Sequence, residues 1–263
     1  MKSPNLLEDI NSDLPEWYKT FISFYCKYDY KLINIKSGED HIFENFSFKE
    51  AYWEMMTLLM PYNFESYAIL LHQPADFYTE EFPLQTRKEI YTAYGISIDN
   101  IDLSDIENLA LLDDLMWRNS TEIESFEIDD LENGRCSRKQ FDFIASKINS
   151  FFNGDIYYHY GILKCISYGK SDIDSSIRDY KLFKSSSFLI YDELEELSRI
   201  ATQPDGIFSI NGNWAIITDY DQPYTFIGGS RELINSLISE KYDLYEIKPK
   251  YIAMVLNEKI KDA

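Results

Sequence analysis

The sequence predicts an α+β fold in which a helix-rich N-terminal half packs with a largely antiparallel sheet in the C-terminal half. Serines followed three residues later by an acid or an amide precede apolar residues at helical spacing, mostly in the first half of the 263-residue chain. Short runs rich in tyrosine, isoleucine and phenylalanine, separated by turn residues, concentrate in the second half. Helices first and strands later favour α+β over an alternating α/β arrangement.

The helices are placed by their start and stop signals. Capping boxes begin at Ser47, Ser104 and Ser137, and the helix after Ser137 is expected to end with Gly154 as its C-terminal cap. Pro15 indicates the first turn of an earlier helix, because a residue in that turn needs no backbone N–H donor and proline has none. This helix is expected over residues 13–25. Apolar spacing and flanking turn residues predict further helices over residues 84–94, 192–201 and 230–239.

The strands follow from apolar and aromatic runs between turn signals. The clearest feature is a hairpin of residues 208–210 and 214–217 around Asn211-Gly212-Asn213, because an Asn-Gly pair favours a tight turn. Further strands are expected over residues 66–71, 156–167, 224–227 and 244–247. The C-terminal part is therefore expected to be an antiparallel sheet with a helix against it.

The domain organisation is expected to be a single domain, residues 1–263. No stretch rich in proline, glycine and serine divides the chain, and its length is enough to bury a large core. The alternative is an acidic helical subdomain, residues 1–133, followed by a sheet-containing subdomain, residues 134–263. Composition shifts near that boundary.

The net charge of −20 is the strongest compositional signal, and it is unevenly spread. Residues 1–134 carry 27 acids against 9 bases, whereas residues 135–263 carry 18 against 16, and the densest stretch, residues 99–132, has twelve acids and the single base Arg118. Such charge repels nucleic acid and anionic lipid and attracts a basic protein. The expected partner-binding residues are Asp113, Asp114, Glu122, Glu124, Glu127, Asp129, Asp130 and Glu132. The alternative is an acidic face that only aids solubility.

The expected location is the cytoplasm. The N-terminus has no apolar segment of the signal-peptide type, and no apolar run approaches membrane-spanning length. Cys26, Cys136 and Cys165 form neither a CxxC pair nor an even set, which argues against a disulfide framework and for a reducing compartment.

Catalytic, metal and cofactor motifs are absent from the sequence. There is no nucleophile elbow, phosphate-binding loop, dinucleotide fingerprint or His-Glu-x-x-His sequence. His41, His72 and His159 lack metal-ligand spacing, although acids beside His41 permit a divalent ion. His159 and Cys165 share a face of a predicted strand, but six residues separate them, too far for a hydrogen bond. We therefore expect no catalytic residues, no metal and no cofactor.

Two acidic pairs keep an enzymatic alternative open. Asp113-Asp114 lies in a predicted helix, and Asp219 and Asp221 follow a predicted strand, where carboxylates two residues apart share a face. Turn chemistry before Pro223 accounts for the second pair equally well.

The segment from Gly206 to Asp221, with Trp214 in its second strand, and the following Phe226-Ile227-Gly228-Gly229-Ser230 carry a family resemblance. They resemble the C-terminal hairpin and helix of several small bacterial immunity proteins and of uncharacterised Firmicute-type families. The resemblance covers about a fifth of the chain and implies a core role for Trp214, with no catalytic residue to carry over. It implies a protein that neutralises a toxin by binding it.

The sequence therefore favours a non-enzymatic protein-binding module, such as a bacterial immunity protein, that acts through its acidic surface on a basic partner. The alternatives are an enzyme with a carboxylate-based site around Asp219 and Asp221, and a structural or regulatory domain whose acidity keeps it soluble or mimics DNA.

Overall fold

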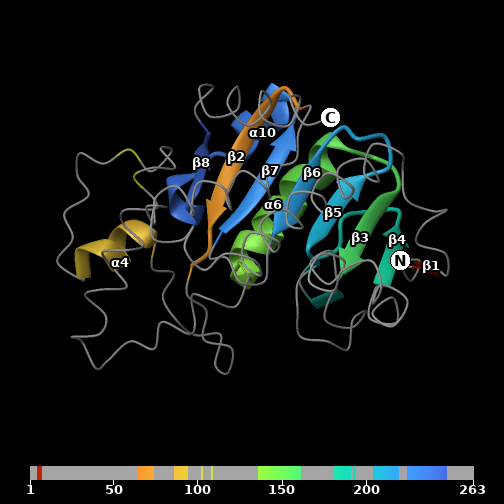
Figure 1. Cartoon of the computed structure of the whole chain (residues 1–263), viewed down its shortest axis with the longest axis horizontal. Coiled ribbons are helices and arrows are strands. Elements are labelled where there is room, and N and C mark those ends of the chain that lie inside the picture. Colours follow the sequence, from red (N-terminus) through yellow and green to blue (C-terminus); the bar gives the residue numbers. More distant parts are fainter. Residues whose placement is uncertain are drawn as a thin grey trace, which may run out of the picture.

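The computed structural model describes residues 5–7, 64–73, 86–93, 102, 108, 136–160, 181–190, 192–193, 204–218 and 224–247 (Figure 1). The strands are β1 (Asn5–Leu7), β2 (Ser66–Leu71), β3 (Ile156–Tyr160), β4 (Lys181–Ser185), β5 (Gly206–Ser209), β6 (Ala215–Thr218), β7 (Tyr224–Gly229) and β8 (Leu244–Glu246). The helices are α4 (Arg87–Ala93), α6 (Arg138–Phe151), α10 (Arg231–Leu237) and the 3₁₀ turn η4 (Glu240–Tyr242). The architecture is α+β.

The strands form one eight-stranded sheet in the order β1-β4-β3-β5-β6-β7-β2-β8, and all its pairings are antiparallel. The middle of the sheet, β5-β6-β7, is built from neighbouring strands joined in sequence. β2 comes from the first third of the chain yet lies between β7 and β8 (Figure 1). Its register pairs Leu71 with Tyr224 and Leu70 with Leu244, so the ends of β2 and β6 and the starts of β7 and β8 meet at one edge of the sheet.

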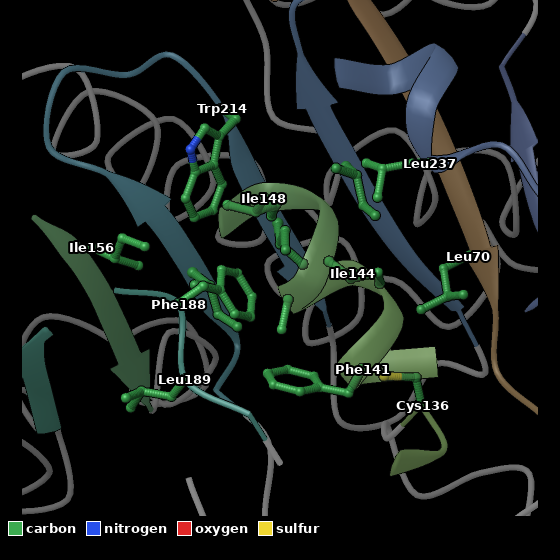
Figure 2. Packing of buried hydrophobic residues seen from close by; sticks show 14 of the residues in the cluster. Leu70, Cys136, Phe141, Ile144, Ile148, Ile156, Phe188, Leu189, Trp214 and Leu237 are labelled. Carbon is green, nitrogen blue, oxygen red and sulfur yellow. The ribbon is translucent and has the colours of Figure 1, made fainter. Parts of the chain in front are cut away.

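The helix α6 carries the main core. Its capping box at Ser137 is confirmed, and its inner face buries Phe141, Ile144 and Ile148. Figure 2 shows these side chains between Phe188 and Trp214 on one side and Leu237 and Leu70 on the other. Burying this many apolar side chains is the dominant stabilising contribution.

Trp214 is the aromatic centre of that core, as the sequence predicts. It is 2% exposed. Its ring packs edge-on against that of Phe152, with the ring centroids 5.9 Å apart, and at a tilt against that of Phe188, with the centroids 5.8 Å apart. The opposite sheet face is buried as well, where the rings of Tyr157 and Phe208 stack at 5.5 Å.

The structure confirms the predicted strands at 66–71, 224–227 and 244–247 to within two residues, and it confirms the hairpin. The predicted strand 156–167 is seen as β3 up to Tyr160, and its remainder lies outside the described residues. The predicted helices at 13–25 and after Ser47 and Ser104 lie in the part of the chain that the structure does not describe, apart from single residues.

One expectation is wrong: Gly154 does not cap α6. The C-cap is Phe152 in an extended conformation, and its N–H donates to the carbonyl of Ile148. The C-cap lies two residues before Gly154, because Phe152 turns inward to pack against Trp214. Gly154 instead lies beside the Phe152 ring.

Candidate functional site

A cluster of buried polar side chains lies at the sheet edge where β2 and β6 end and β7 and β8 begin, next to the N-terminus of α6. We call it the polar cluster. All its members are at most 5% exposed except Tyr245, which is half-buried; they are His72, Gln73, Arg87, Gln140, Thr218, Thr225, Asp243 and Tyr245. So many polar groups in a core need internal partners, and the hydrogen bonds among them form the site.

Gln140 ties three segments together. As the third residue of α6 its Oε1 accepts from the N–H of Ser137, which completes the capping box, and also from the N–H of Gln73 at 3.1 Å. Its Nε2 donates at 2.8 Å to the carbonyls of both Leu71 and Tyr242. The whole hydrogen-bonding capacity of this amide is therefore used, and one side chain joins α6 to the end of β2 and to η4.

Asp243 is the second junction. It closes η4 with left-handed backbone angles, φ 52° and ψ 42°, which asparagine and aspartate tolerate better than most residues. Its Oδ2 accepts from Gln73 Nε2 at 2.8 Å and from the backbone N–H of Arg87 at 2.9 Å, and its Oδ1 accepts from the Tyr245 hydroxyl at 3.1 Å. The carboxylate therefore links β2, the start of α4 and β8.

The electrostatics of Asp243 are set by opposing effects. Burial raises the pKa of its carboxyl, while the hydrogen bonds from Gln73, Arg87 and Tyr245 and the charge of Arg87 pull it down. Burial, and then the nearby Asp243 charge, raise the pKa of the Tyr245 hydroxyl, so Tyr245 stays a neutral donor. Arg87, at 1% exposure, is the buried positive charge of the polar cluster.

His72 and two threonines form the third part of the polar cluster. His72 Nε2 lies 2.8 Å from Thr225 Oγ1, and that hydroxyl is hydrogen-bonded to the hydroxyl of Thr218. Burial, and then the charge of Arg87, lower the pKa of His72 to about 3. The imidazole is therefore neutral at physiological pH, where a neutral ring is one donor and one acceptor.

Chemically, the polar cluster contains a neutral imidazole, the hydroxyls of two threonines and of Tyr245, and a carboxylate, the groups that proton transfer uses. None of them except Tyr245 is reached by solvent to an appreciable extent. The geometry instead holds six segments of the chain in one place, and the polar cluster stabilises the fold.

The predicted partner-binding residues Asp113, Asp114, Glu122, Glu124, Glu127, Asp129, Asp130 and Glu132 all lie outside the described residues. The same holds for Asp219 and Asp221, the carboxylates of the enzymatic alternative, and for His41, Cys26 and Cys165.

The remaining sequence candidates are buried. His159 is 1% exposed on the sheet face away from α6, and burial lowers its pKa to about 3. Cys136 is buried next to the N-cap of α6. Within the described ranges, no group of three or more histidines, cysteines and acids is placed to hold a metal ion.

Gln73, Arg87 and Asp243 are not among the residues that the sequence predicts to form a site. One signal was present: Thr86 and Glu89 form a capping box at the start of α4, in which each side chain accepts the other's backbone N–H. It fixes Arg87 as the first helical residue. Nothing in the local sequence marks Asp243 as part of a site, because two of its three partners, Arg87 and Gln73, are 156 and 170 residues away.

Comparisons of the chain with protein-family models, with curated proteins and with solved structures find no match. Among the residues whose structure is described, no helix is long and apolar enough to cross a membrane.

Proposed function

We propose that this chain is a non-enzymatic protein-binding module of the bacterial cytoplasm, of the kind that neutralises a toxin. Its partner is a basic protein, and the acidic stretch, residues 99–132, is the surface that meets it. The observation that carries the proposal is the charge asymmetry: 27 acids against 9 bases in residues 1–134, and 18 against 16 in the remainder.

The concentration of charge has a physical cost and a physical use. Twelve acids and one base in residues 99–132 repel one another and oppose folding. The same field attracts a positively charged partner from solution and raises its association rate. A protein that needed charge only for solubility would gain as much from acids spread over both halves, so the asymmetry favours a directed role.

The sheet half of the chain supports binding over catalysis. The side chains of Gln73, Gln140 and Asp243 are hydrogen-bonded to one another's segments and to the backbone, and they hold the fold together. The exposed acids of this half, including Glu232, Glu240 and Glu246, are scattered over separate elements. The acidic stretch is therefore the part of the chain to test first.

The test compares two variants that each remove three charges. The first carries Glu122→Gln, Glu124→Gln and Glu127→Gln in the acidic stretch, and the matched control carries Glu232→Gln, Glu240→Gln and Glu246→Gln on the sheet half. Wild type and both variants are immobilised and exposed to lysate of the native host at low and at moderate salt. A captured basic protein is purified, and its affinity for each chain is measured by calorimetry.

The expected result is a basic partner whose binding weakens with salt and with the first variant but not with the control. Three charges at about 0.5 kcal/mol each amount to roughly ten-fold weaker binding. Capture of no basic protein, an affinity independent of salt, or equal losses in both variants would refute the proposal.

A further inference from the structure

The chain contains the pair Asn-Gly at residues 153–154 and again at residues 211–212. A third pair, Asn133-Gly134, lies outside the described residues. Asn-Gly is the sequence in which an asparagine side chain is most easily attacked by the next backbone nitrogen, because glycine has no Cβ to obstruct the approach. The two described pairs therefore offer a comparison within one molecule.

The two asparagines are alike in their exposure to solvent. Asn153, between α6 and β3, and Asn211, in the β5-β6 turn, are both exposed, and both following glycines are half-buried. No hydrogen bond is found for either asparagine side chain in the described part of the chain. Solvent access and side-chain pairing thus do not distinguish them.

The two glycine nitrogens differ. The Gly212 N–H donates to the carbonyl of Ser209 at 3.0 Å, and the hairpin holds Gly212 at φ 67°. For Gly154, no such hydrogen bond is found among the described residues, and the residue lies outside both α6 and β3. Attack by Gly212 requires its hydrogen bond to break and the hairpin turn to open.

We propose that Asn153 is a site of spontaneous conversion to aspartate and isoaspartate in the folded protein, and that the hairpin protects Asn211. The backbone nitrogen of Gly154 attacks Cγ of Asn153 and forms a cyclic imide, while the side-chain nitrogen takes up the proton of the backbone N–H and leaves as ammonia. One water then opens the imide. Cleavage at Cγ gives aspartate, and cleavage at the main-chain carbonyl carbon gives isoaspartate.

Conversion at Asn153 changes the connection between α6 and β3. Isoaspartate adds one atom to the main chain between Phe152, which packs on Trp214, and Ile156, which pairs with Ser209. Either product adds a negative charge beside the ion pair of Asp155 and Lys184. This inference is independent of the proposed binding function.

The test uses the purified full chain, incubated at mildly alkaline pH and at physiological temperature and sampled over days. Samples are digested in acid, and mass spectrometry of the peptides follows the mass gain at each asparagine, while enzymatic methylation detects isoaspartate. Breaking one hydrogen bond alone makes conversion at Asn211 at least about five-fold slower than at Asn153. Equal rates, or faster conversion at Asn211, would overturn the proposal.

A second arm repeats the incubation in urea, where the fold no longer restrains either nitrogen. The conversion rates at Asn153 and Asn211 are expected to become equal in urea. A ratio that persisted in urea would mean that neighbouring side chains and not the fold set the difference, which also contradicts the proposal. Asn153→Gln, whose longer side chain would need a six-membered ring, is expected to abolish conversion at residue 153 and leave that at Asn211 unchanged.

Discussion

Gln73 Nε2 donates a 2.8 Å hydrogen bond to Oδ2 of Asp243, a residue 170 positions further along the chain. The same nitrogen donates to the carbonyl of Lys241 at 3.1 Å. The end of β2 is thereby fixed to the turn between η4 and β8, and β2 is held between β7 and β8 by more than its backbone ladder.

Gln140→Ala is expected to destabilise the protein by about 3–5 kcal/mol, because it removes the partner of two buried N–H groups, of one buried carbonyl and of one part-buried carbonyl, and opens a cavity. The free energy of unfolding in urea measures the loss. Lys139→Ala, at the exposed neighbouring position, is the control and is expected to change stability by less than about 0.5 kcal/mol. Similar losses in both variants would contradict the role assigned to Gln140.

Substitutions at Asp243 separate its backbone role from its side-chain role. Both Asp243→Gly and Asp243→Ala lose the bonds from Gln73, Arg87 and Tyr245. Only alanine also suffers at φ 52°, so it is expected to be less stable than the glycine variant by about 1 kcal/mol. Urea unfolding of the pair measures this difference, and an alanine variant as stable as the glycine variant would argue against the left-handed backbone.

Gly228 is expected to accept no side chain. A Cβ there would lie 2.8 Å from Cγ of Phe64, near the fixed base of that ring, whereas a Cβ at Gly229 would meet the mobile end of Leu233 at 3.0 Å. Gly228→Ala is expected to cost about 2–3 kcal/mol and Gly229→Ala under about 1 kcal/mol.

Thermal or urea unfolding ranks the two glycine variants. Adding Phe64→Leu to Gly228→Ala is expected to recover part of the loss, which a double-mutant cycle detects. The absence of any coupling between residues 64 and 228 would refute the contact.

Stability is expected to fall in mild acid. The pKa values of His72 and His159 are lowered to about 3 in the folded protein, below the usual 6.5, so the unfolded chain binds protons more readily between these values. The two neutral histidines contribute their full stabilisation above pH 6.5, and this contribution is lost as the pH falls toward 3. By pH 5, each histidine is expected to have lowered the free energy of unfolding by about 2 kcal/mol. Asp243 acts in the opposite sense, because its raised pKa makes the folded state hold a proton more tightly as the pH falls.

Urea midpoints measured between pH 7 and pH 5 check this prediction. His72→Gln keeps an uncharged polar side chain and is expected to show a shallower dependence on pH than the wild type, by about one proton. A slope unchanged in the variant would mean that His72 titrates normally in the folded protein.

Much of the local structure was predictable because its causes are local. The capping box of α6 and the Asn-Gly turn of the β5-β6 hairpin involve residues within a few positions of one another, and both are confirmed. The position of Gly154 misled the prediction because the end of α6 depends on the packing of Phe152 against Trp214, 62 residues away.

The amino-acid sequence by itself determined the charge asymmetry, the α+β class and the local signals that start helices and turns, since each depends on composition or on neighbouring residues. Only the tertiary structure decided that β2 lies between β7 and β8, and that Gln73, Gln140 and Asp243 share one polar cluster. A buried polar group takes its partners from whichever segments the packing brings near. In the polar cluster these partners lie up to 170 residues apart, so no local stretch of sequence records them.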